Sequence, residues 1–180
     1  PEVAPTPASF SDEPLVDPEP PALRGALEVI DTESTGRILE DIRAGTNFCR
    51  EFVDPEYAID CLSDRLQSVA DGLSATGEYA EVRAALEDAA ANLHDLALRN
   101  AADELSRSIA RATDGSGRTS GRPLTAIDPA KLEAANAEAA AIIANTQLVL
   151  LRSGAESERR KVAFQQVGQV LGQTVVLLRS

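Results

Sequence analysis

The residues of this chain best suited to covalent chemistry are its two cysteines, Cys49 and Cys61. Between them lies Asp54-Pro55, a pair typical of a corner at which a new helix starts. Two helices that meet at a tight corner bring such positions within the roughly 4.4–6.8 Å between Cα atoms that a disulfide requires. We therefore predict a Cys49–Cys61 disulfide, worth about 3 kcal/mol in the loop-entropy description. Two buried free thiols are the alternative, because the spacing fits neither a Cys-x-x-Cys redox motif nor a zinc site.

A single histidine, His94, limits the other chemistry open to the chain. A di-iron helical bundle needs a histidine on each of two helices, and histidine-based zinc sites need two or three. No Cys-x-x-Cys-His haem motif occurs either. We expect no metal and no cofactor, and we expect His94 to be a boundary residue hydrogen-bonded to a neighbour.

The acidic side chains and the glycine-rich segment do not form a catalytic pattern. Acid pairs such as Glu40-Asp41 are typical of solvated helix faces. Residues 115–121 lack the Gly-Lys-Ser/Thr ending of a phosphate-binding loop. Arg118 and Arg122 could hold an anion there, but the composition favours a mobile linker. We therefore predict that the chain is not an enzyme.

A basic cluster near the C-terminus is the candidate docking site. It consists of Arg152, Arg159, Arg160 and Lys161. Cations at the start of a helix gain nothing from the helix dipole, so an acidic partner would account for them, such as the acidic front half of another copy. An ordinary exposed face is the alternative.

Composition and charge favour an all-α protein that does not bind polyanions. The chain has 180 residues, no Trp, no Met and only 3% aromatic residues, while Ala and Leu dominate. The net charge of −12 repels nucleic acid and anionic lipid, so neither is an expected partner.

The chain divides into a tether and one domain. Residues 1–22 hold seven of the ten prolines among five acidic residues, which predicts an extended, disordered tether. A polyproline ligand is the alternative for this stretch. Residues 23–180 are predicted to form a single helical domain. The absence of a starting Met suggests that a signal or anchor has been removed, and with the predicted disulfide it favours a periplasmic or other extracytoplasmic location.

Apolar periodicity predicts an antiparallel bundle of about five helices. The expected spans are approximately 22–50, 55–75, 78–112, 129–153 and 156–179. Gly77 is expected just past the second helix, and residues 113–127 form the plainest loop. The third helix is the longest, with Leu105, Ile109 and Ala112 near its end. No uninterrupted run of about 18 apolar residues occurs, so no direct membrane insertion is expected.

The last two helices are predicted to form a hairpin, with one continuous helix through Gly154 as the alternative. Two fully apolar runs, Leu148–Leu151 and Val175–Leu178, leave no polar side on these helices. Such a hairpin lies at the centre of the bundle or forms half of a homodimer interface. Burial within one chain is the preferred interpretation.

These observations favour an interaction protein over an enzyme. We expect a non-enzymatic, extracytoplasmic scaffold or sensory module that binds a protein partner. The alternative is a carrier that holds an apolar small molecule or lipid in a slot between helices.

Overall fold

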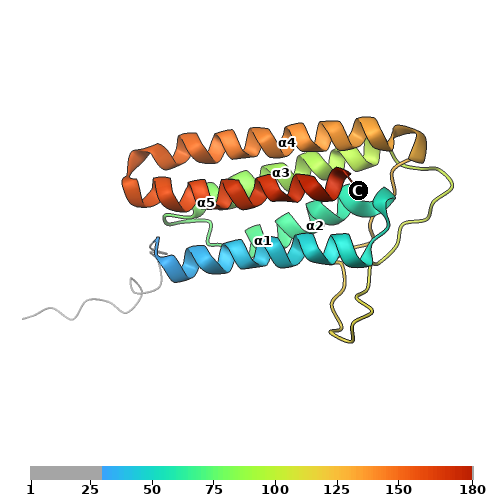
Figure 1. Cartoon of the computed structure of the whole chain (residues 1–180), viewed down its shortest axis with the longest axis horizontal. Coiled ribbons are helices and arrows are strands. Elements are labelled where there is room, and N and C mark those ends of the chain that lie inside the picture. Colours follow the sequence, from blue (N-terminus) through green and yellow to red (C-terminus); the bar gives the residue numbers. More distant parts are fainter. Residues whose placement is uncertain (1–29, 180) are drawn as a thin grey trace, which may run out of the picture.

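The computed structural model describes residues 30–179, which form a bundle of five α-helices (Figure 1). They are α1 (Thr32–Phe52), α2 (Ala58–Asp71), α3 (Ala80–Arg99), α4 (Leu132–Ser153) and α5 (Glu158–Thr174). Short 3-10 segments precede α2 and α4 and follow α4 and α5: Pro55–Tyr57, Pro129–Lys131, Gly154–Glu156 and Val175–Arg179. The predicted all-α bundle is confirmed. The predicted tether, residues 1–22, lies outside the described residues.

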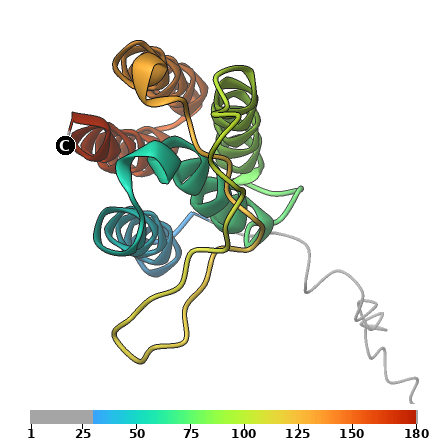
Figure 2. The ribbon, with the colours of Figure 1, turned by 90° about the vertical axis from the view of Figure 1, so that its right-hand side faces the viewer.

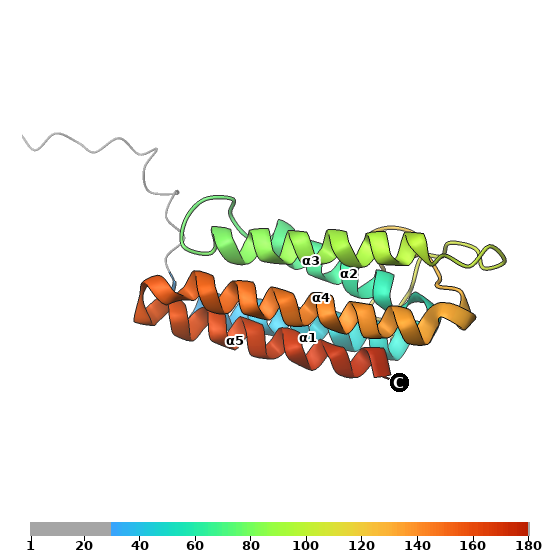
Figure 3. The same ribbon diagram turned by 90° about the horizontal axis from the view of Figure 1, so that it is seen from above.

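Successive helices run in opposite directions and pack in chain order (Figures 1 and 3). Each helix packs against the next, and α5 closes the bundle by packing against α1. Seen from one end, the helices surround a shared core (Figure 2). That core is built mainly from Leu, Ile, Val and Ala, with Phe48, Tyr79 and Phe164 as its largest members.

The first helix begins at a side-chain cap. The Asp31 carboxylate accepts the backbone N–H of Ser34 at 2.7 Å, which satisfies one of the free donors at the helix start. Residues Thr32–Gly36 therefore form the first turn of α1. The part of the predicted span before residue 30, with Leu23 and Leu27, lies outside the described residues.

The second helix is shorter than predicted at both ends. Asp54-Pro55 opens a 3-10 turn in which Asp54 makes no side-chain cap bond, and α2 itself begins at Ala58. The helix ends at Asp71 with Gly72 as its C-cap, so the expected role of Gly77 is wrong. Gly77 has φ of +95° and lies in the link to α3, where a left-handed residue turns the chain.

The predicted third helix, 78–112, is wrong beyond residue 99. Asn100 ends α3, since its side chain donates to the Leu96 carbonyl at 2.9 Å. Residues 100–127, which we call the strap, run out and back as an extended hairpin with isolated antiparallel bridges, including Ala101 to Ile127. The apolar spacing of residues 100–112 does not mark a buried helix face, since Leu105 is 40% exposed. Pairing within the strap and contacts to α2 outweigh the local helix preference.

The last two helices form the predicted hairpin rather than one continuous helix. Asp128 caps the turn before α4 by accepting the N–H of Ala130 at 2.9 Å, and Ser157 caps α5 through Arg160 N–H at 3.2 Å. The helices approach closely at Gly168 and Gly172, which face Gln147 of α4. Gln147 donates from its amide to the Gly168 carbonyl at 2.8 Å.

The hairpin is not central to the bundle, contrary to the preferred interpretation of its apolar runs. Leu148 is 50% exposed, Leu151 49% and Val176 63%. The helix buried on nearly every side is α2, whose residues 58–64 are all buried. The strap contacts the first half of α2 through Asp60 and Asp64, and the exposed residues of this helix, Ser68 and Asp71, lie in its second half.

Candidate functional site

The two cysteines form the predicted disulfide. Cys49 in the last turns of α1 and Cys61 in the first turns of α2 are bonded, with 5.8 Å between their Cα atoms. Both are fully buried. The bond ties the α1–α2 corner beneath the strap, so it is a structural crosslink rather than an exposed reactive pair.

A buried carboxylate, Asp60 on α2, holds the strap. Its side chain is fully buried and accepts two hydrogen bonds from the Arg122 guanidinium at 2.6 and 2.8 Å. It also accepts the Thr125 backbone N–H at 2.7 Å and contacts Nδ1 of His94 at 2.7 Å. A buried carboxylate with this many donors is fully paired, which makes the cluster a clamp between α2, α3 and the strap.

A second carboxylate one turn further along α2 continues the clamp. Asp64 accepts the backbone N–H of Gly121 at 3.0 Å and forms an ion pair with Arg65. Arg65 in turn donates to the Thr119 carbonyl at 3.0 Å. The segment expected to be a mobile linker is therefore held at several points. The anion that Arg122 binds is a side chain of the same protein.

The pKa of Asp60 follows from these contacts. Burial by itself would raise the pKa, but the hydrogen bonds from Arg122, His94 and Thr125 outweigh it and lower the pKa below its ordinary value of 3.8. The Asp60 carboxyl raises the pKa of Arg122 in turn. Both groups stay charged across the physiological pH range.

The contacts of this cluster join α2, α3 and the strap. The His94 side chain is about one-third exposed. As predicted, it is a boundary residue that is hydrogen-bonded to a neighbour. Neither Asp60 nor His94 lines any of the five principal hollows in the described part of the chain. Among residues 30–179, no group of three or more metal-ligating side chains is placed to hold a metal ion.

The four residues of the predicted basic docking patch do not share one environment. Arg160 is largely buried, paired with Glu156 and Glu81, and stacked over the Phe164 ring at 5.5 Å. Lys161 is exposed beside Glu158 at 3.7 Å. Arg152 and Arg159 are exposed and have no ion-pair partner among residues 30–179. A docking role stays a prediction for Arg152, Arg159 and Lys161, while Arg160 already links α5 to α3.

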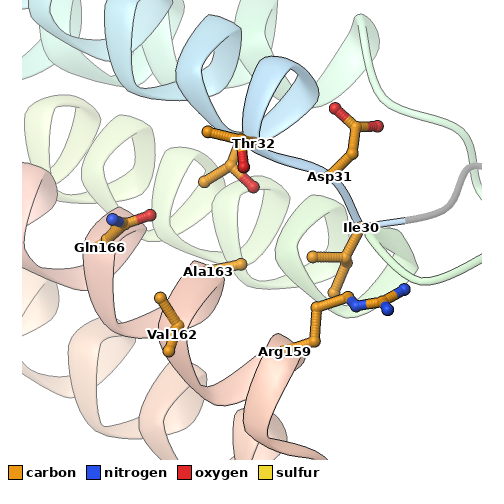
Figure 4. Close-up of a pocket in the computed structure, with 8 residues that line it drawn as sticks. Ile30, Asp31, Thr32, Arg159, Val162, Ala163 and Gln166 are labelled. Carbon is orange, nitrogen blue, oxygen red and sulfur yellow. The ribbon is translucent and has the colours of Figure 1, made fainter.

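A groove of about 570 Å³ lies between the start of α1 and the start of α5 (Figure 4). Ile30, Val162 and Ala163 supply its apolar side chains, and the groove is open to solvent. Asp31 and Arg159 place one acidic and one basic group at its edges.

The most unusual surface is the outer face of the α4–α5 hairpin, which we call the hairpin face. Residues 139–151 and 162–178 contain no charged side chain, although the whole chain carries a net charge of −12. Of the seven large exposed apolar residues among residues 30–179, five lie in these two segments: Leu148, Val149, Leu151, Val162 and Val176. Val149 borders α3 and Val162 borders α1, while Leu148 and Leu151 lie on the outer side of α4. On α5, exposed glutamines fill much of the remaining area: Gln165, Gln166, Gln169 and Gln173.

The apolar character of α4 is high enough to resemble a membrane span by length and composition. Within the helical stretch Pro129–Glu156, an 18-residue window has a mean hydropathy of 1.2, and 28% of that window is buried. No other helix within residues 30–179 meets the same criteria.

No protein-family model, no curated protein and no solved structure matches this chain. The choice among functions therefore depends on the geometry described above.

Sequence reasoning missed the strap clamp because Asp60 and Asp64 are acidic residues in an acidic chain. A signal was present, since both lie one turn apart in a segment that is otherwise largely apolar. The apolar runs of the hairpin are visible in the sequence, but their spacing does not reveal that Leu148, Leu151 and Val176 are exposed.

Proposed function

We propose that this chain is a non-enzymatic helical interaction module that docks onto a protein partner through the hairpin face. The observation that carries the proposal is the exposed, uncharged surface of α4 and α5. Exposed apolar patches of this kind on an otherwise charged protein are typical of interaction sites.

Two further features support a docking role over catalysis. The buried ionisable cluster around Asp60 is used to hold the strap, and all of its strong contacts are within the chain. The exposed glutamines of α5 add hydrogen-bonding groups without charge, which suits a surface that becomes partly buried on binding.

The proposed setting is outside the cytoplasm, as in the periplasm. The Cys49–Cys61 disulfide supports this setting, because such bonds persist in oxidising compartments. Thiol labelling of protein from its native source tests it. In denatured samples we expect labelling at the two cysteines only after reduction, and labelling of freshly lysed, denatured cells without reductant would contradict the proposed setting.

Site-specific photo-crosslinking in the native source tests the docking face. We expect a photoreactive residue at Leu148 or Gln169 to give one discrete adduct, and the same residue at Ala91, on the exposed side of α3, to give none. The purified partner should bind Leu148→Lys at least about tenfold more weakly than the parent protein. Equal adducts at Ala91, or unchanged binding by Leu148→Lys, would exclude the hairpin face.

A second candidate, a carrier of an apolar small molecule, is supported by the groove between α1 and α5. Its volume of about 570 Å³ lies within the range of ligand sites. Val162→Trp, at an exposed residue that lines the groove, should fill it and abolish binding of a fluorescent fatty acid, while Ala91→Trp should not. Equal binding of the probe by both variants, or no binding by the parent protein, would exclude the groove.

A further inference from the structure

We infer that the partner of α4 is a second copy of this chain, bound antiparallel about a two-fold axis near Thr146. The inference rests on the proposed function, because it names the occupant of the α4 part of the hairpin face. It is carried by the spacing, the sizes and the charges of the side chains exposed on this helix.

Seven exposed apolar residues of α4 and of the 3-10 turn after it lie at heptad spacing. These positions are spaced by alternating steps of three and four and form the α4 face: Ala134, Ala137, Ala141, Ala144, Leu148, Leu151 and Ala155. Val149 is also exposed, but it lies off this face, beside α3. The residues that face the core, such as Ala139, Ile143 and Leu150, form a separate buried stripe. A heptad seam on the solvent side is the pattern by which one helix packs against another.

Side-chain sizes favour one antiparallel register. If Ala144 of one copy faces Leu148 of the other, then Ala141 faces Leu151 and Ala137 faces Ala155. The two central layers each pair a small residue with a large one, so the surfaces interlock, and symmetry repeats both layers on the other side of the axis.

Flanking charges favour the same register. Glu138 and Arg152 lie on the same edge of the α4 face, one at each end of it, and both are exposed. In an antiparallel dimer, Arg152 of each copy lies beside Glu138 of the other, which gives two such pairs. The two Asn145 side chains lie between these pairs. Arg152 has no ion-pair partner within residues 30–179, and Glu138 meets only the exposed Arg99 at 2.7 Å.

The competing arrangements bring like charges together. A parallel pair in register sets Glu133 of one chain beside Glu138 of the other. An antiparallel pair shifted by one heptad sets Arg152 near Lys131. Like charges at these flanking positions disfavour association, so the register with Arg152 beside Glu138 is selected.

A second copy fits this face better than a membrane surface does. Interfacial membrane helices combine basic polar faces with Trp or Phe, whereas α4 has acidic residues at its start and no aromatic residue. The helix is about 33 Å long, so two copies bury on the order of 1,000 Å² in total. Such an area predicts a concentration-dependent dimer with a dissociation constant of roughly micromolar size.

Sedimentation equilibrium of the parent protein and of α4 variants tests the inference. We expect a reversible monomer–dimer equilibrium that Ala141→Lys abolishes and Arg152→Glu weakens at least about tenfold. Exchanging the charges in Glu138→Arg/Arg152→Glu should restore dimerisation. Ala91→Lys, an exposed substitution on α3 outside the hairpin face, is the matched control and should leave the dimer intact.

Cysteine crosslinking tests the orientation, since both native cysteines are already bonded to each other. A mixture of Ala141→Cys and Leu151→Cys proteins should form the mixed disulfide in preference to either homodimer. Preferred homodimers would indicate a parallel pair and overturn the proposed geometry.

A monomer at all concentrations, or a dimer insensitive to Ala141→Lys, would overturn the inference. A monomer that binds phosphatidylglycerol vesicles through α4 would overturn it in favour of a lipid surface. If the chain is monomeric but Leu148 still crosslinks to a different protein, the inference fails and the proposed docking function stands. If Leu148 crosslinks to nothing, both fail.

Discussion

At the scale of single residues, the decisive side chains are the paired charges beneath the strap. Asp60 is fully buried, yet it is surrounded by donors from Arg122, His94 and the backbone of Thr125. A buried ion pair adds little net stability compared with a packed apolar pair, but removing one partner leaves an uncompensated group. The clamp therefore specifies where the strap lies.

Asp60→Asn should lower the free energy of unfolding by about 3 kcal/mol, because Arg122 loses its counter-charge and one amide proton faces other donors. Urea denaturation followed by circular dichroism measures this change. Asp95→Asn, on the exposed side of α3, is the matched control and should change stability by less than about 0.5 kcal/mol. An equal effect of the two substitutions would show that the clamp contributes nothing.

The Asp60 carboxyl also predicts how the stability of the fold changes as the pH falls. The pKa of Asp60 is lower in the folded protein than the ordinary value of 3.8. Its contribution is therefore complete above about pH 4 and is lost as the pH falls through the lowered folded-state pKa, because the unfolded chain takes up the proton first. The urea concentration at the unfolding midpoint should fall as the pH is lowered from 6 to 2.5. The fall should be smaller in Asp60→Asn than in the parent protein. The pKa of Asp114 is also lowered, to about 2, so some slope should remain.

At the scale of elements, helix α1 shows how packing reverses a local preference. Gly36 lies on its exposed side with nothing within 4 Å of an added Cβ. At Gly45 an added Cβ would lie 2.9 Å from the Arg65 Cβ of α2. Glycine thus has no packing role at position 36, whereas at position 45 it permits close contact between α1 and α2.

Gly36→Ala should stabilise the protein by about 0.5–1 kcal/mol, since alanine is the better helix former. Gly45→Ala should be destabilising by about 1–2 kcal/mol, because α1 and α2 must separate near the disulfide. Thermal unfolding of the two variants measures both signs. A stabilising Gly45→Ala would mean that the helices adjust without cost.

At the scale of the whole molecule, stability should depend on protein concentration if α4 pairs with a second copy. Association of one folded chain with another stabilises the folded state, so the melting temperature rises with protein concentration. We expect the melting temperature of the parent protein to increase over a hundredfold concentration range, and that of Ala141→Lys to stay constant. A constant value for both proteins would argue against a dimer.

Much of the architecture could be read from apolar spacing. Three features depend on residues that are close in sequence: the hairpin of α4 and α5, the apolar stripe of α2 and the cysteine pairing. Over such short separations, helix geometry allows few arrangements of the chain. The end of α3 could not be read in this way. Leu105, Ile109 and Ala112 continue the apolar spacing, but their segment is held in the strap by residues far along the chain.

The candidate docking surface shows the same division. The sequence alone established that the hairpin helices are apolar and free of charge over most of their length, because composition and periodicity are local properties. Which side of each helix faces solvent was decided by the bundle, since α3 and α5 leave the outer side of α4 exposed while the strap covers the first half of α2. Burial is a property of the assembled helices, and in the bundle part of the segments expected at the centre is exposed to solvent.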